Sequence, residues 1–269
     1  MYKILTGVCD MKNQKDPSPK NLDRALELLN LLSASAAPMN VMEISKALDV
    51  TRTTAYAMLG SLSAKNLVER DPDTGRYCIG YKVLELAESY YHQYPFLYVA
   101  EKYIVSMAQK WSMKVNISVL KDPAICLLLA SKDPSFLIPR MVIGHIMPAY
   151  ATASGKVLLA ALPPEEQERL LDSINLVPYT QRTITDKDRL LDALGQIRRQ
   201  GYATELEELM IQRSCVAAPI HNRANQVIAA ISFSASSESL AQNHSALVND
   251  IISAGNQISA ELGYNYVIL

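Results

Sequence analysis

Apolar residues recur at helical intervals on both sides of Asp49, between residues 41 and 62. This spacing predicts two short helices that bury one shared apolar seam and are separated by a sharp turn. Asp49 suits the turn because Asp adopts the left-handed backbone conformation more readily than most residues. Thr51 is expected to cap the second helix, since its hydroxyl can accept a backbone N–H from the following turn. The seam consists of Ile44, Ala47, Leu48, Val50, Ala55, Met58, Leu59 and Leu62.

A further helix and a hairpin are predicted on either side of this pair. Downstream, residues 71–75 (Asp-Pro-Asp-Thr-Gly) join two strand-like runs and have the composition of a tight turn. We therefore expect a winged helix-turn-helix domain over residues 20–80, preceded by a flexible tail at 1–19. Upstream apolar residues at helical spacing predict a first helix packed behind the other two: Leu22, Ala25, Leu26, Leu28, Leu29 and Leu32.

The start of the second helix of the pair is the predicted DNA-binding element. In helix-turn-helix proteins this part of the helix contacts base edges in the major groove. A small helical domain that binds another protein has the same periodicity, so that alternative stays open. The residues predicted to contact DNA, on this helix and beside the tip of the wing, are Thr51, Arg52, Thr53, Thr54, Tyr56, Arg70 and Arg76.

Net charge does not decide between these alternatives. Residues 20–82 contain eight basic and seven acidic side chains, whereas DNA-binding domains usually have a strongly basic face. DNA binding would therefore depend on the local placement of Arg52, Arg70 and Arg76.

The whole chain has the composition of a globular protein, with 269 residues, 49% hydrophobic and 20% charged, and a formal net charge of -1. It contains no apolar run of about 18 residues and no convincing signal peptide, although Met11 is a second possible start. The cysteines, at Cys9, Cys78, Cys126 and Cys215, are too widely spaced to predict a zinc site or a disulfide framework. We expect a cytoplasmic protein without a metal, a cofactor or a membrane contact.

Residues 81–95 are expected to form a connector helix that ends before Pro95. Half of the chain's 14 tyrosines lie between positions 77 and 103. Aromatic side chains with polar tips are enriched at interfaces, which favours either packing between domains or contact with a second copy. A second helix is predicted from Phe96 to Trp111.

The remaining sequence predicts strands and helices in separate groups. Residues 113–130 and 215–234 each have the pattern of a β-hairpin. Helices are expected at 155–162, 164–174, 186–200 and 239–262. Antiparallel strands with segregated helices indicate an α+β domain of the GAF or PAS type, rather than a doubly wound nucleotide-binding fold.

Several separated motifs resemble those of the IclR family of bacterial transcriptional regulators. They are residues 21–26, 151–160, 201–208, 213–220 and 229–234, which match in order and spacing. The resemblance covers about residues 20–262. It implies a GAF-like effector-binding and oligomerisation domain at 96–269, a homodimer or homotetramer, and control of transcription by a small metabolite. A dimeric helix-turn-helix protein would read a palindromic double-stranded DNA operator.

The resemblance also implies a set of effector-binding positions: Ala153, Ser154, Glu205 on a loop, Cys215, Ser232 and Ser234. The residues themselves favour a carboxylate ligand. Thr152 or Ser154 can cap a helix that begins at Gly155, and a helix N-terminus attracts anions. Strand alternation places Ser232 and Ser234 on one face, where their hydroxyls could bind a small polar ligand. Each residue also has an ordinary structural role, as a cap, a small buried thiol or a core serine.

Departures from the family pattern concern mainly DNA recognition. Ala57 stands where many members have an arginine, and Asp49 and Gln212 stand where glycine is usual. We expect operator recognition to differ as a result. A third alternative is an enzyme that uses Cys215 with His221 or His145, but no third partner is evident. The glycine spacing of a phosphate-binding loop is absent around Gly155 and Lys156. The sequence therefore favours a regulator and not an enzyme.

Overall fold

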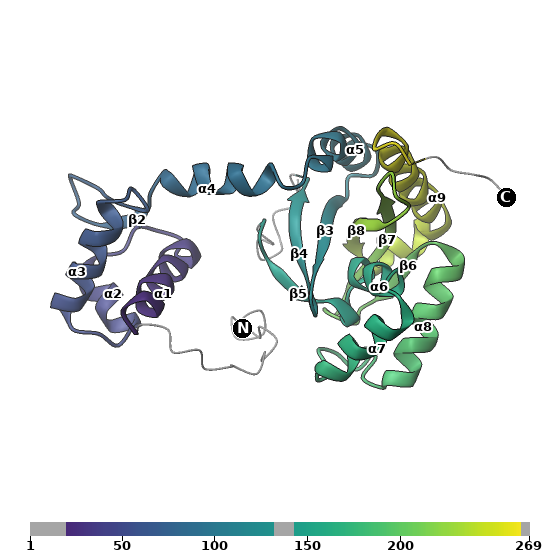
Figure 1. Cartoon of the computed structure of the whole chain (residues 1–269), viewed down its shortest axis with the longest axis horizontal. Coiled ribbons are helices and arrows are strands. Elements are labelled where there is room, and N and C mark those ends of the chain that lie inside the picture. The colour runs from purple at the N-terminus through teal and green to yellow at the C-terminus, as the bar shows by residue number, and fades with distance from the viewer. Residues whose placement is uncertain (1–19, 132–142, 265–269) are drawn as a thin grey trace. The chain divides into compact units, whose positions relative to one another are not determined.

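The computed structural model describes residues 20–131 and 143–264 (Figure 1). The chain divides into two compact units between Pro95 and Phe96. None of the described helices combines the length and the apolar character that crossing a bilayer requires. The predicted tail at 1–19, with Met11 and Cys9, lies outside the described residues.

The first unit contains the predicted winged helix-turn-helix. Asp49 adopts a φ of 51° at the turn, and the Thr51 hydroxyl accepts the Thr54 N–H at 3.2 Å, which confirms the predicted turn and cap. Asn40 and Glu43 form a capping box at the start of the preceding helix. The elements are α1 (Lys20–Ala34), α2 (Val41–Ala47), α3 (Arg52–Ser63), β1 (Val68–Arg70) and β2 (Tyr77–Ile79).

The wing is an antiparallel β1–β2 hairpin closed by a hydrogen-bonded turn. The Asp71 carboxylate accepts backbone N–H groups from Asp73 at 3.0 Å and Thr74 at 2.7 Å. The Thr74 contacts in particular lower the pKa of Asp71. Gly75 has a φ of 68°, a conformation that favours glycine. The turn prediction is thus confirmed, with Asp71 organising the tip.

The first helix packs only partly as predicted. Leu28 and Leu32 are buried against α2 and α3, in a core that also contains Ile44, Leu59 and Tyr77. The prediction was wrong for Leu22 and Leu26, which are 54% and 51% exposed. A three-helix unit of this size has too little interior for every apolar position of α1.

The connector helix α4 (Lys82–Tyr91) is shorter than the predicted 81–95 and has no buried residue. Its Leu84 and Leu86 are 71% and 55% exposed. The apolar pattern of this segment predicted a helix correctly, but that helix exposes its leucines.

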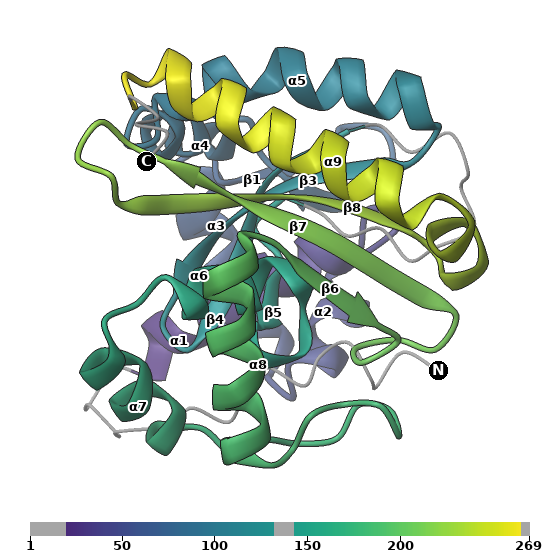
Figure 2. The same ribbon diagram turned by 90° about the vertical axis from the view of Figure 1, so that its right-hand side faces the viewer.

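The second unit is a six-stranded sheet with helices on both faces (Figure 2). All paired strands are antiparallel, in the order β5-β4-β3-β8-β7-β6. The strands are β3 (Lys114–Lys121), β4 (Ala124–Ala130), β5 (Ile146–Pro148), β6 (Ala203–Leu206), β7 (Arg213–His221) and β8 (Val227–Ser236). The helices are α5 (Phe96–Trp111), α6 (Ala153–Ala160), α7 (Pro164–Ser173), α8 (Lys187–Gln200) and α9 (Ser237–Glu261), with a short 3-10 helix at Ala149–Ala151.

Helices α5 and α9 cover one face of the sheet, and α6 with α8 covers the other (Figure 2). On the first face, Trp111 of α5 packs edge-on against Phe233 of β8, with ring centroids 6.4 Å apart. A Cβ on Gly255 would lie 2.6 Å from the Pro219 carbonyl oxygen, so glycine lets α9 approach β7 closely. The second face contains a separate apolar core built on α6.

The four longer strands confirm the predicted hairpins, whereas β5 and β6 were not predicted. Both are short edge strands of three and four residues, and so short a segment shows no clear alternation. The assignment of Glu205 to a loop was consequently wrong, since Glu205 lies within β6.

Candidate functional site

The start of α3 presents a polar surface opposite its buried stripe. Thr51, Arg52, Thr53 and Tyr56 are exposed, and Thr54 is half-buried. The other side of α3 buries Ala55, Met58, Leu59 and Leu62 in the core. Because the stripe fixes the rotation of the helix, the predicted DNA-contacting side chains of this segment are directed outward.

The two wing arginines differ in their surroundings. The Arg76 guanidinium donates to the Pro38 carbonyl at 2.9 Å and forms an ion pair with Glu43 at 3.1 Å. Arg70 is exposed; its Nε donates to the Gly75 carbonyl at 3.4 Å and its guanidinium lies over the Tyr77 ring. Among the described residues only Arg70 of this pair lacks an ion-pair partner. Sequence reasoning missed the role of Arg76 in joining the wing to α2.

Three predicted effector-binding residues form one row across the sheet. Glu205 of β6 is paired in register with Cys215 of β7, and Cys215 with Ser234 of β8. Residues opposite each other in register project to the same face. Ser232, two residues from Ser234, occupies the neighbouring row, so the prediction that the two serines share a face is confirmed. Glu205, Ser232 and Ser234 are all buried.

Ala153 and Ser154 begin α6, the helix that packs against this same face. The cap is Thr152, whose hydroxyl accepts the Gly155 N–H at 3.1 Å. The helix therefore starts two residues earlier than predicted, and Ser154 is not its cap. A Cβ on Gly155 would lie 2.2 Å from the Ala149 carbonyl oxygen, so this turn of α6 requires glycine.

Asn116 is a polar residue of this face that the sequence analysis missed. It lies on β3, paired in register with Ser232, and is buried. Its side-chain oxygen has no hydrogen-bond partner among the described residues. Buried polar atoms are usually satisfied, so this oxygen is available to a ligand or a water molecule. The available signal was an asparagine between Val115 and Ile117 in a predicted strand.

Glu205 is only 2% exposed, and its carboxyl group has backbone partners. It accepts backbone N–H groups from Glu208 and, at 3.4 Å, from Leu209. Burial raises the pKa of Glu205 to about 7, opposed by the Glu208 N–H and assisted by the Glu208 carboxylate. A substantial share of Glu205 is therefore protonated, and uncharged, at neutral pH.

Beside Glu205 lies a buried ion pair between Lys156 of α6 and Glu208, which follows β6. The Glu208 backbone carbonyl accepts the Thr183 hydroxyl at 2.6 Å. Lys156 and Glu208 thus connect the start of α6 to the segment after β6. The sequence analysis missed this pair, although a lysine within an otherwise apolar helix was a signal.

The environment of Cys215 does not support the thiol-enzyme alternative. Burial raises the pKa of its thiol to about 12, so the nucleophilic thiolate is scarce at neutral pH. His221 lies at the opposite end of β7, where its ring stacks on Tyr264 with centroids 4.8 Å apart. Six residues of strand separate the two side chains by roughly 20 Å. Across the described ranges, no group of three His, Cys, Asp or Glu residues could hold a metal ion.

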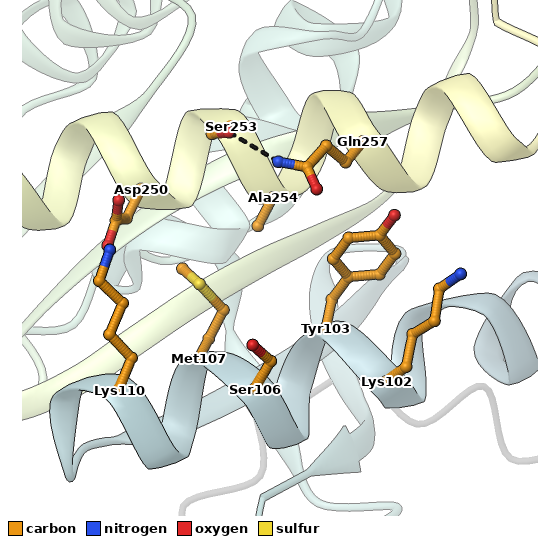
Figure 3. Close-up of a pocket in the computed structure, with 9 residues that line it drawn as sticks. All are labelled: Lys102, Tyr103, Ser106, Met107, Lys110, Asp250, Ser253, Ala254 and Gln257. Carbon is orange, nitrogen blue, oxygen red and sulfur yellow. Dashed lines mark hydrogen bonds and ion pairs between the residues drawn. The ribbon is translucent and has the colours of Figure 1, made fainter.

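A separate groove of about 440 Å³ lies between α5 and α9, on the other face of the sheet (Figure 3). Lys110 pairs with Asp250 at 2.6 Å near one end, and the Gln257 amide donates to Ser253 at 2.9 Å. None of the predicted effector-binding residues lines this groove. Its lining is Lys102, Tyr103, Ser106, Met107, Lys110, Asp250, Ser253, Ala254 and Gln257.

Comparison with known proteins identifies a matching family model for each of the two units. The model of the bacterial transcriptional regulator IclR C-terminal domain matches residues 88–260, and that of the IclR helix-turn-helix domain matches 21–72. The HTH-type transcriptional regulator XynR of Escherichia coli strain K12 is 27% identical over 249 residues, which cover 92% of this chain and 99% of XynR.

Solved structures have the same two-domain fold. The crystal structure of Thermotoga maritima IclR aligns with a TM-score of 0.80 at 26% identity, covering 90% of this chain and 98% of that one. An IclR homolog from Microbacterium hydrocarbonoxydans, complexed with 4-hydroxybenzoate, aligns with a TM-score of 0.77 at 22% identity, with coverages of 90% and 98%.

These matches agree with the winged helix-turn-helix and the antiparallel α/β domain predicted from the sequence. The relatives are transcriptional regulators and not enzymes. The segment that matches the helix-turn-helix model lies in the domain that the sequence predicts to bind DNA. The chain therefore belongs to the IclR family of bacterial transcriptional regulators.

Proposed function

We propose that this regulator binds its operator through α3 and the wing, and that a small carboxylate bound against the α6 side of the sheet changes its DNA affinity. The main support for this effector site is that Glu205, Cys215, Ser232 and Ser234 lie on the face of the sheet against which α6 packs. Each of these side chains has a structural role, but several polar groups gathered in one apolar core are typical of a ligand site.

A carboxylate suits the donors gathered there. The first N–H groups of α6, at Ala153 and Ser154, lack partners within the helix and carry the positive end of its dipole. The Ser232 and Ser234 hydroxyls add further donors. The Microbacterium homolog holds 4-hydroxybenzoate, itself a carboxylate, which supports the same ligand class here.

The operator-binding surface that we propose comprises Thr51, Arg52, Thr53, Thr54, Tyr56 and Arg70. Arg76 belongs at its edge, because Glu43 already neutralises its charge. Ala57 is exposed on the same helix and offers no charged contact, so Arg52 and Arg70 supply most of the positive charge of this surface. We expect sequence to be read mainly from α3.

We also propose a homodimer or homotetramer that reads a palindromic operator. The exposed leucines support this oligomer: Leu22 and Leu26 on α1, and Leu84 and Leu86 on α4, are each more than half exposed. Large apolar side chains that are exposed in the isolated chain can be buried against a second copy. Light scattering of the purified chain measures the mass directly, and a monomer would contradict this part of the proposal.

Calorimetry tests the effector site. A panel of small carboxylates, including 4-hydroxybenzoate, would be titrated into wild type, Ser232→Ala and the surface control Ser173→Ala. For the acid that binds, we expect Ser232→Ala to lose up to about tenfold in affinity, the equivalent of one hydrogen bond, and Ser173→Ala to bind normally. Fluorescence anisotropy with DNA from upstream of the gene that encodes this chain then reports whether that acid changes the affinity for the operator. Equal affinity of both variants would place the site elsewhere, and absence of DNA binding would favour the protein-binding alternative.

A further inference from the structure

Arg213 is a charged residue on the same sheet face as the proposed effector site. It begins β7, two residues before Cys215, so strand alternation directs both side chains to one face. Its guanidinium Nη2 donates to the Ser234 hydroxyl at 3.2 Å, across to β8. Its backbone is also fixed: its N–H donates to the Met210 carbonyl at 3.2 Å, and its carbonyl accepts the Glu207 N–H at 3.1 Å.

The charges on this face leave Arg213 without a counter-ion. The Lys156 ammonium is neutralised by Glu208, and Glu205 is partly protonated at neutral pH because burial raises its pKa to about 7. Arg213 is partly buried, and arginine side chains are cations in proteins. Among the described residues it forms no ion pair, and a partly buried cation without an opposite charge is unfavourable.

We propose that Arg213 is the counter-ion for the effector, and that its guanidinium, together with the Ser234 hydroxyl, binds the effector's carboxylate. The inference rests on the proposed function and narrows it to anionic organic acids. A guanidinium presents paired N–H donors that match the two oxygens of a carboxylate. The bond to Ser234 uses one donor and orients the group, and the other donors stay available to a ligand.

An alternative role for Arg213 is purely structural, as a brace between β7 and β8. The two roles predict opposite results for the protein without ligand. A brace stabilises the fold, so its removal lowers Tm. A charge held for a ligand and left uncompensated costs stability. Arg213→Met keeps an unbranched side chain but removes the guanidinium and its charge, so it should raise Tm by about 2 °C.

The binding test uses the full chain and matched pairs of probes. Acetate, benzoate and 4-hydroxybenzoate would each be titrated beside the corresponding neutral amide, into wild type, Arg213→Met, Arg213→Lys and the control Arg189→Met on the exposed surface of α8. For an acid that binds wild type, we expect at least a tenfold loss with Arg213→Met and a smaller loss with Arg213→Lys, which keeps the charge without the paired donors. Arg189→Met should match wild type, and the amides should bind weakly.

The outcomes separate this inference from the proposed function. If an acid binds wild type and Arg213→Met equally, Arg213 is not its counter-ion, while the carboxylate effector site stands. If the amides bind as tightly as the acids, or if no acid binds, both the inference and the carboxylate assignment are overturned. A lower Tm for ligand-free Arg213→Met, with unchanged affinity for the acid, identifies Arg213 as a brace.

Discussion

The two units of this chain place their polar groups in opposite ways. In residues 20–95, Ser45 is the only buried polar side chain described, and the charged residues lie at the surface or half-buried. In the described residues from 96 onward, buried polar groups are common and include Lys156, Glu205 and Glu208.

This difference corresponds to two kinds of binding. A DNA duplex is a large polyanion, which is recognised from outside by exposed side chains on a rigid helix. A small ligand has to be enclosed, and its specificity comes from a few polar groups inside an apolar surrounding. Burial makes each of those groups costly when it is unpaired. Changes at the two sites should therefore differ in how much they affect stability.

The largest effect is expected at the buried ion pair. Lys156→Met leaves the Glu208 carboxylate buried without its partner and should lower the free energy of unfolding by about 3–5 kcal/mol. Urea unfolding followed by the fluorescence of Trp111, the chain's one tryptophan, monitors this unit. Lys187→Met is the control, since it removes only the exposed pair with Asp172, and its midpoint should match wild type. Equal midpoints for the two variants would show that the buried pair contributes no more to stability than the exposed pair.

The exposed site should lose binding without losing stability. Arg52→Ala is expected to weaken operator binding by about 1–3 kcal/mol if Arg52 contacts a base, or to reduce the salt dependence of binding if it contacts a phosphate. Its Tm should stay at the wild-type value. Anisotropy titrations at several salt concentrations measure both effects, with Arg24→Ala on the exposed part of α1 as control. Unchanged affinity and salt slope would remove Arg52 from the DNA surface.

The buried carboxyl predicts a pH dependence of stability. Folding raises the pKa of Glu205 from 4.5 to about 7, so between these values the folded state binds more protons than the unfolded state. The stability from Glu205 is fully present below about pH 4.5 and is lost as pH rises through about 7. Relative to Glu205→Gln, wild type should lose on the order of 2 kcal/mol between pH 5 and pH 8. Parallel pH profiles for the two proteins would refute the assignment.

The smallest effect is expected at a surface cap of the first unit. Asn40→Ala removes the side-chain acceptor for the Met42 and Glu43 N–H groups, each at 2.9 Å, and should cost about 1 kcal/mol. Thermal unfolding followed by circular dichroism measures the change. Ser61→Ala, at an exposed position within α3, should be nearly neutral because alanine favours helix. A loss at Ser61 as large as that at Asn40 would indicate that the cap has no special role.

Most of the fold was predictable because its determinants are local. Helical spacing around Asp49, the cap at Thr51 and the turn at 71–75 each depend on neighbouring residues, and all three predictions were confirmed. Short edge strands carry too little pattern, which is why β6 was missed and Glu205 was assigned to a loop. The exposure of the leucines on α1 and α4 could not be predicted either, because apolar spacing does not show whether another part of the protein covers that face of the helix.

The sequence by itself determined the two-domain architecture, the family, and most candidate residues of the two sites, because periodicity, capping and motif order are properties of the chain. Only the tertiary structure decided which polar and charged groups are buried and which of them are paired. Register across β6, β7 and β8 aligned Glu205, Cys215 and Ser234 in one row. Packing of α6 against the segment after β6 paired Lys156 with Glu208. Burial and charge pairing depend on residues distant in sequence, and these long-range contacts place Arg213 beside Ser234 with no ion-pair partner among the described residues.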